Sequence, residues 1–129
     1  MAKLILDTTF LLDLLRGQKA ALNIAQELEE SRSEVYTTAI NCYELLLGAK
    51  RLGRVAETEA LLADLKVLAL TKKAADEAAS IQHSLTSEGK ILDHRDALML
   101  GIALAYDVRS IISNDDDLKR VHEITVTRY

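Results

Sequence analysis

The sequence is poor in cysteine, aromatic residues and proline, and each shortage excludes a feature. Cys42 is the only cysteine, so no disulfide forms within the chain, and its apolar neighbours indicate a small buried group and not a catalytic thiol. Aromatic residues make up 4% of the 129 residues, which argues against a platform of rings for stacking bases. Proline is absent, which suits long, uninterrupted helices.

Long apolar runs are missing as well. The first residues are apolar enough to suggest a targeting segment, but Asp7 and Asp13 interrupt them, so this stretch is interpreted as part of the folded protein. Because no run of about 18 uncharged apolar residues is present, no membrane span is expected and the expected location is the cytoplasm. The net charge of -4 argues against a general basic surface for nucleic acid. Contacts with phosphates therefore have to be local or carried by metal ions.

Short strand-like runs alternate with longer amphipathic patterns along the chain. Strands are predicted at residues 3–6, 34–38, 66–70, 110–113 and 123–129. Helices are predicted at residues 18–31, 37–52, 54–65, 72–89 and 93–107. Because parallel strands need long crossovers, the alternation predicts an α/β fold with a central, mostly parallel sheet of about five strands and helices on both faces. No linker or repeat interrupts the pattern, so residues 1–129 are expected to form one domain.

Acidic and hydroxyl residues follow three of the predicted strands. Asp7 follows the first strand, Thr38 ends the second, and residues 113–117 follow the fourth. The carboxyl ends of parallel strands meet at one edge of the sheet, where open α/β sheets bind ligands. Taken singly, each aspartate has an ordinary alternative role as a helix cap. Asp93 and Asp96 likewise suit the start of a helix, and Asp93 is interpreted as a cap and not as a ligand.

Glu44 is the acidic residue with the weakest structural explanation. It lies inside a predicted helix, and the residues three and four positions away are apolar or uncharged: Ile40, Asn41, Leu47 and Gly48. An unpaired buried carboxylate is unfavourable, so the partner of Glu44 has to be a distant residue or a cation. Glu44 follows Thr38 by six residues, about 9 Å of helix, and helical side chains lean toward the helix start. This geometry allows its carboxylate to approach the sheet edge.

Four carboxylates at one edge, those of Asp7, Glu44, Asp96 and Asp115, would repel one another. The repulsion raises their proton affinities unless a divalent cation offsets the charge. Oxygen ligands without histidine or cysteine favour Mg2+ or Mn2+ over zinc. Such ions activate water and stabilise the leaving oxygen when a phosphodiester is cleaved. These four residues are therefore the candidate catalytic set.

Four segments, taken in order, resemble the motifs of the PIN-domain family. LILDTTFLLDLLRG is similar to the first motif, with its aspartate at Asp7, and TTAINCYELLLGA is similar to the second, with its glutamate at Glu44. ILDHRDALMLGIALAYD is similar to the third motif, with its aspartate at Asp96, and ISNDDDLKRV resembles the closing motif. The likeness covers nearly the whole chain. Within the family it is to the VapC toxins of bacterial and archaeal toxin–antitoxin pairs.

This resemblance implies a three-layer, Rossmann-like α/β/α fold and an endoribonuclease that depends on Mg2+ or Mn2+ and cuts single-stranded stretches of structured RNA. It also implies a homodimer, and a small antitoxin protein whose tail covers the active site. By the same resemblance Asp7, Asp96 and Asp115 hold the metal, and Glu44 assists directly or through water. The hydroxyls of Thr9 and Ser113 are supporting groups that orient water or phosphate.

The sequence departs from the family pattern at a few positions. Three consecutive aspartates leave the register of the fourth metal ligand open between Asp115 and Asp117. Leu118 stands where a phenylalanine is expected, and Ser113 where threonine is more usual. Gly101 lies inside the last predicted helix, which it weakens by about 1 kcal/mol relative to alanine while allowing close packing.

Two alternatives remain open. One is a signalling module with an acidic magnesium pocket, such as a phosphoacceptor receiver domain, although such a module does not require Glu44. The other is a PIN-like scaffold that binds RNA or a partner without cutting. His94, next to Arg95, is interpreted as an exposed residue at a helix start and not as an RNA contact. Lys50, Arg51 and Arg54 form the best basic cluster, either a solvated face or a contact for phosphate.

Overall fold

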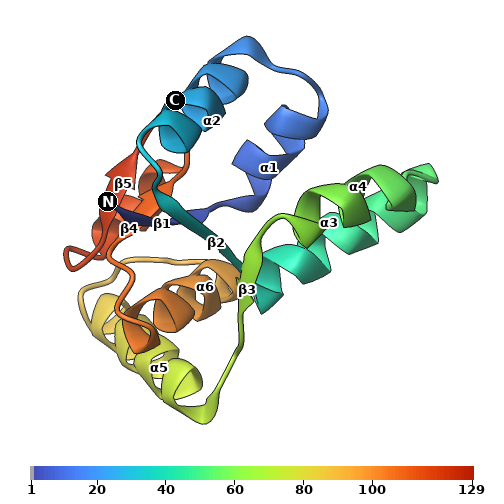
Figure 1. Cartoon of the computed structure of the whole chain (residues 1–129). Coiled ribbons are helices and arrows are strands. Elements are labelled where there is room, and N and C mark those ends of the chain that lie inside the picture. The colour runs from blue at the N-terminus through green and yellow to red at the C-terminus, as the bar shows by residue number, and fades with distance from the viewer. Residues whose placement is uncertain (1) are drawn as a thin grey trace.

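The computed structural model describes residues 2–129, and five strands within that range pair into one sheet (Figure 1). These strands are β1 (Lys3–Leu6), β2 (Glu34–Thr38), β3 (Lys66–Leu68), β4 (Ser110–Ile112) and β5 (Thr125–Thr127). Their order is β3-β2-β1-β4-β5, and every neighbouring pair is parallel. The predicted α/β class with a parallel five-stranded sheet is therefore confirmed. The order also matches the first five strands of the Rossmann arrangement.

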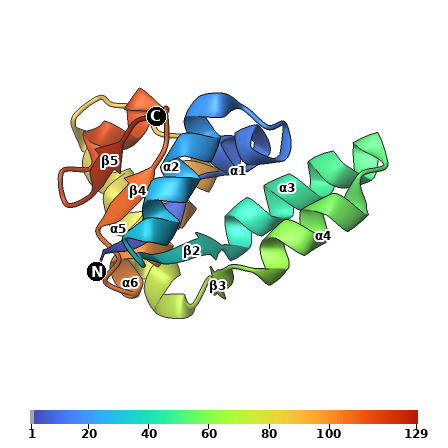
Figure 2. The ribbon, with the colours of Figure 1, turned by 45° about the horizontal axis from the view of Figure 1, so that its top comes forward.

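Helices cover both faces of this sheet (Figure 1). The helices are α1 (Thr8–Leu15), α2 (Lys19–Glu30), α3 (Ala39–Leu52), α4 (Val55–Ala63), α5 (Lys72–Ser87) and α6 (His94–Ala105). A short 3-10 helix, η1 (Asp116–Arg120), follows β4. In Figure 2, α3 and α4 run alongside each other and extend beyond the sheet. None of the helices among residues 2–129 is both long and apolar enough to span a bilayer.

Strand β1 divides the apolar interior into two cores. Side chains alternate between the faces of a strand, so Leu4 and Leu6 pack against α1 to α4 while Ile5 packs against α5 and α6. Strand β4 repeats the division, with Ile112 in the first core and Ile111 in the second. All five side chains are buried. The three-layer arrangement thus follows from strands that are apolar on both faces, as expected for a covered parallel sheet.

Several elements are shorter than the sequence pattern predicts. The strand predicted at 66–70 ends at Leu68, and the strand predicted at 123–129 is limited to Thr125–Thr127. Both are edge strands with one neighbour each. The last residue of β2, Thr38, pairs with Leu68, and the last residue of β4, Ile112, pairs with Thr127. Without a partner beyond these positions, the edge strands end there.

Polar side chains begin the helices around the carboxyl edge of the sheet. The Asp7 carboxylate accepts a hydrogen bond from the backbone N–H of Thr8 at 2.8 Å and caps α1. The Thr38 hydroxyl accepts from the N–H of Asn41 at 3.3 Å and caps α3. Asp93 caps α6, as the sequence predicts. Caps satisfy backbone donors that have no partner within the helix, so the same residues that start the helices also place polar groups at this edge.

Candidate active site

Four separate segments bring the predicted carboxylates to one place. Asp7 follows β1 and is 8% exposed, Glu44 lies in α3, and Asp96 lies in the first turn of α6. Asp115 follows β4 and caps η1. The negative charges of Asp7, Glu44 and Asp115 all act on Asp96. The residues singled out from the sequence therefore form one electrostatic cluster at the carboxyl edge of β1 and β4.

Asp7 is held at the centre of the cluster by hydrogen bonds. The Ser113 hydroxyl donates to Asp7 Oδ2 at 2.6 Å, and the Asn41 amide donates to Asp7 Oδ1 at 3.4 Å. Ser113 is fully buried, and its oxygen also accepts from the N–H of Asp115 at 3.0 Å. One buried serine thus ties the first aspartate to the segment that carries the fourth. The supporting role of Ser113 in binding water or phosphate stays a prediction.

Glu44 is fixed from two sides. The Thr8 hydroxyl donates to Glu44 Oε1 at 2.8 Å, and Glu44 Oε2 forms an ion pair with Arg95 Nη1 at 3.3 Å. Thr9, the hydroxyl residue chosen from the sequence, is exposed, and the hydroxyl that contacts Glu44 belongs to its neighbour Thr8. The sequence predicts that Glu44, which has no basic neighbour in its own helix, pairs with a distant residue or a cation. Arg95 is such a distant partner.

Asn41 is a site residue that the sequence analysis does not assign. Its side chain is 1% exposed, its amide donates to Thr8 Oγ1 at 2.9 Å, and its Oδ1 accepts from the Thr38 hydroxyl at 2.6 Å. It therefore links Thr8 and Asp7 to the start of α3. The available signal was its position three residues before Glu44, which places both side chains on one helical face.

Burial and repulsion from neighbouring charges raise the proton affinity of two of the carboxylates, those of Asp7 and Asp96. Burial raises the pKa of the Asp7 carboxyl above its usual value, although the hydrogen bonds from Ser113 and Thr8 oppose the shift. Burial is also the largest cause that raises the pKa of Asp96, followed by the charges of Asp115 and Asp7, and this pKa reaches about 7. A pKa shifted this far is typical of functional sites. The protein thus concentrates negative charge that a bound cation would offset.

The three consecutive aspartates have different environments. The charge of Asp115 raises the pKa of both Asp7 and Asp96. Asp117 is exposed, and its carboxylate pairs with Arg120 Nη2 at 3.3 Å. Asp116 pairs with Lys119 at 3.3 Å and with Arg128. Of the two candidates for the fourth ligand, Asp115 is the one whose charge acts on Asp7 and Asp96, and its role as a ligand stays a prediction.

The donor set has the chemistry that Mg2+ or Mn2+ requires, because every candidate ligand is a carboxylate. Among residues 2–129 no three acidic, histidine or cysteine side chains are gathered into a ready metal site. The residues fit a hard cation by type and charge.

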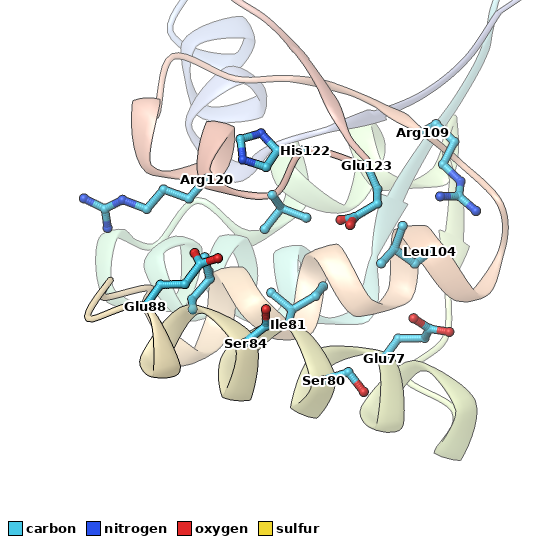
Figure 3. A pocket seen from close by; sticks show the side chains of 12 residues that line it. Glu77, Ser80, Ile81, Ser84, Glu88, Leu104, Arg109, Arg120, His122 and Glu123 are labelled. Carbon is cyan, nitrogen blue, oxygen red and sulfur yellow. The ribbon is translucent and has the colours of Figure 1, made fainter.

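Two cavities of the molecule are lined by residues outside this cluster. A cavity of about 330 Å³ lies between α5 and the segment that follows η1. Figure 3 shows Ser80 and Ser84 of α5, and Glu88 directly after this helix, on one side of it, and Arg120 and His122 on the other. A more apolar cavity of about 490 Å³ lies among α1, α2, β2 and α4. None of the predicted site residues lines either of these two cavities.

Replacing Asn41 with alanine tests how strongly this buried amide supports the site. The change leaves the hydroxyls of Thr8 and Thr38 without their buried partner, so we expect the free energy of unfolding to fall by about 1–3 kcal/mol. Urea unfolding measures the effect. Asn23→Ala, at an exposed position of α2, is the control and should change the stability little. Equal stability of the two variants would mean that the amide network contributes nothing.

The fold and the site define this protein as an α/β protein with an all-parallel sheet and a cluster of acidic side chains at the carboxyl edge of that sheet. A family model described as the PIN domain matches residues 4–124. The chain belongs to the PIN-domain family, as its four motifs predict. A comparison with curated proteins found no match.

Solved structures show the same fold at low sequence identity. VapBC2 from Rickettsia felis, bound to a DNA fragment from its promoter, is 16% identical, with 98% of both chains covered and a TM-score of 0.84. DNA-bound VapBC from Salmonella typhimurium is 20% identical, with 99% of this chain and 98% of that chain covered and a TM-score of 0.82. VapC20 from Mycobacterium tuberculosis, a sarcin–ricin loop cleaving toxin, is 16% identical, covers 91% of this chain and 93% of its own, and has a TM-score of 0.67.

Proposed function

We propose that this protein is a VapC-type toxin and that it acts as an endoribonuclease dependent on Mg2+ or Mn2+. The observation that carries the proposal is the convergence of Asp7, Glu44, Asp96 and Asp115 from four segments on one sheet edge. Their mutual repulsion and the raised pKa of Asp96 indicate a site arranged for a cation and not for the stability of the fold. Membership of the PIN-domain family supports the same reaction.

In this proposal Asp7, Asp96 and Asp115 hold the metal, which supplies an activated water and stabilises the leaving oxygen. The hydrogen bonds from Ser113 and Asn41 orient Asp7. Glu44, which accepts a hydrogen bond from the Thr8 hydroxyl, would orient the attacking water and accept its proton.

Two partners belong to the proposal. Several proteins of the same fold were solved as VapBC complexes of a toxin with its antitoxin, which supports a small antitoxin as the partner of this chain. A homodimer is implied by the family resemblance, and exposed apolar side chains are available for such an interface: Tyr43, Leu52, Val67, Leu70 and Ile91. The expected cytoplasmic location stays a prediction.

Metal dependence of RNA cleavage tests the proposal directly. A folded RNA with a single-stranded loop is incubated with the purified protein in EDTA, Mg2+, Mn2+ or Ca2+. We expect cleavage with Mg2+ or Mn2+ only, because the site offers carboxylate oxygens alone and needs a cation to activate water. Removing the metal with EDTA should stop the reaction, and adding Mn2+ should restore it. Cleavage of equal rate in EDTA would contradict the proposal.

A non-catalytic scaffold is the second candidate, favoured by the ion pair between Glu44 and Arg95 and by the absence of a ready metal site among residues 2–129. It predicts RNA or partner binding without cleavage in any metal. The receiver-type alternative is wrong for this fold. A receiver domain has the strand order 2-1-3-4-5, whereas β1 here lies between β2 and β4.

A further inference from the structure

Arg95 places a positive charge inside the acidic cluster. It lies in the first turn of α6, next to Asp96, and its guanidinium contacts two carboxylates: Glu44 through Nη1 at 3.3 Å and Asp93 through Nε at 3.3 Å. Among the ion pairs formed by residues 2–129, the pair with Glu44 is the only one that involves any of the four candidate catalytic acids. Arg95 is therefore the basic side chain that the fold supplies to this site.

This position is not explained by the stability of α6. A cation in the first turn of a helix is disfavoured by the partial positive charge of the helix N-terminus. The Arg95 side chain is 57% exposed, and an ion pair at such exposure contributes little to folding. The arginine is thus aimed at the site by Glu44 and Asp93 while most of it remains accessible to a ligand.

The guanidinium retains donors for such a ligand. Arginine carries five N–H groups in a planar fork, and the two contacts engage only Nε and Nη1. A planar fork matches the oxygens of a phosphate and binds them through two parallel hydrogen bonds. The Nη2 group makes neither of these contacts, so the guanidinium can meet a ligand while it remains paired with Glu44 and Asp93.

We propose that Arg95 binds a phosphate of the RNA backbone beside the bond that is cut, and so positions the RNA at the four carboxylates. The inference rests on the proposed nuclease function. The net charge of -4 and the acidic cluster both repel RNA, so a local cation is needed where the backbone approaches the site. Glu44 and Asp93 orient the guanidinium before the RNA arrives.

The test compares Arg95→Gln with Arg95→Lys, using Arg109→Gln as the matched control. Arg109 has a similarly exposed side chain, 52% exposed, and also pairs with a carboxylate, that of Asp107 at 3.0 Å. The values of kcat and KM for RNA cleavage in Mg2+ are measured over a series of salt concentrations. A merely structural arginine has no reason to change how KM depends on salt.

We expect Arg95→Gln to raise KM by about tenfold, because one charge-assisted contact is lost. The slope of log KM against log salt should fall by about 0.7, the value for one phosphate contact on a single strand. Arg95→Lys retains the charge but not the fork, so it should keep the slope of the wild type with an intermediate KM. Arg109→Gln should match the wild type in KM and slope.

Other outcomes overturn the inference in distinguishable ways. If the wild type cuts RNA and Arg95→Gln has the same KM and salt slope, Arg95 does not bind phosphate, and the nuclease proposal stands. A fall in kcat at unchanged KM and slope means that Arg95 acts only through Glu44. A wild type that neither binds nor cuts RNA removes the proposed function together with this inference.

Discussion

Asp96→Asn is expected to abolish RNA cleavage and, at the same time, to stabilise the metal-free protein. Asparagine has nearly the shape of aspartate, but its neutral side chain cannot neutralise the charge of a bound cation. We therefore expect the cleavage rate to fall about 100-fold or more. Stability should rise because the charged carboxylate of Asp96 is unfavourably buried and is also repelled by its neighbours Asp115 and Asp7.

The direction of the pH effect follows from the raised pKa of Asp96. Its pKa is about 7 in the folded protein, compared with an ordinary value of 3.8. Between these two values the folded state keeps a proton that the unfolded chain has released, so the free energy of unfolding falls as pH rises. The loss is complete once the pH exceeds about 7, the pKa of the folded state. Asp96→Asn cannot ionise and should therefore flatten this part of the pH profile.

Two measurements check this prediction. RNA cleavage in Mg2+ gives the activity. Urea unfolding in EDTA gives the stability, measured from about pH 4 to about pH 8 so that the range spans the ordinary pKa of an aspartate and the raised pKa of Asp96. At neutral pH we expect the variant to be more stable by about 1–2 kcal/mol after allowance for solvent screening. Asp76→Asn, at an exposed position of α5, is the control and should change neither quantity. If Asp96→Asn retained full activity, the proposed site would be wrong.

Gly101→Ala is expected to be the most destabilising of the substitutions considered. Gly101 lies in α6 where this helix crosses α5. A methyl group placed there would lie 2.4 Å from the carbonyl oxygen of Ala74 and 2.7 Å from the Cβ of Ala78. The carbonyl belongs to the backbone of α5 and cannot rotate away, so the two helices have to separate.

The net change in stability depends on whether the clash with the α5 backbone outweighs the gain in helix propensity. Helix propensity alone would favour alanine over glycine by about 1 kcal/mol. Overpacking a tight core costs about 1–3 kcal/mol and sometimes more. Because the obstacle is backbone, we expect the upper part of that range, a net fall of about 2 kcal/mol or more in the free energy of unfolding.

Gly48→Ala is the matched control for this substitution. Gly48 lies within α3, and a methyl group there would meet nothing within 4 Å. Its replacement should therefore stabilise the protein, by up to about 1 kcal/mol. Urea unfolding of the two variants should show shifts of opposite sign. Stabilisation of both would mean that α5 and α6 can move apart at no cost.

Most of the fold could be predicted from the sequence because its signals are local. Strand-like residues at 3–6 and 34–38 correspond to β1 and β2 with the same boundaries. The sequence shows Gly101 as a residue of low helix propensity inside a predicted helix. The close approach of α5 explains why a glycine stands there. The edge strands were predicted too long because their ends depend on which neighbours they pair with, which no local pattern contains.

Within the site, residue type and order along the chain were sufficient to identify Asp7, Glu44, Asp96 and Asp115 as candidates. Acidic residues after strands, and a glutamate without a helical partner, are visible in the sequence alone. The partners of these acids were not visible. Asn41 contacts Thr8 and Met99, and Arg95 contacts Glu44, across 33, 58 and 51 positions of sequence.

The sequence by itself determined the α/β architecture and the acidic character of the carboxyl edge, because alternation, helix periodicity and residue chemistry are properties of neighbouring positions. Only the tertiary structure decided which hydroxyl faces Glu44, which of the three consecutive aspartates acts on Asp96, and that Arg95 enters the cluster. These outcomes depend on the direction of side chains from segments that meet only after folding. A rotation of one residue along α1 or η1 exchanges Thr8 for Thr9, or Asp115 for Asp116, with little change in the local pattern.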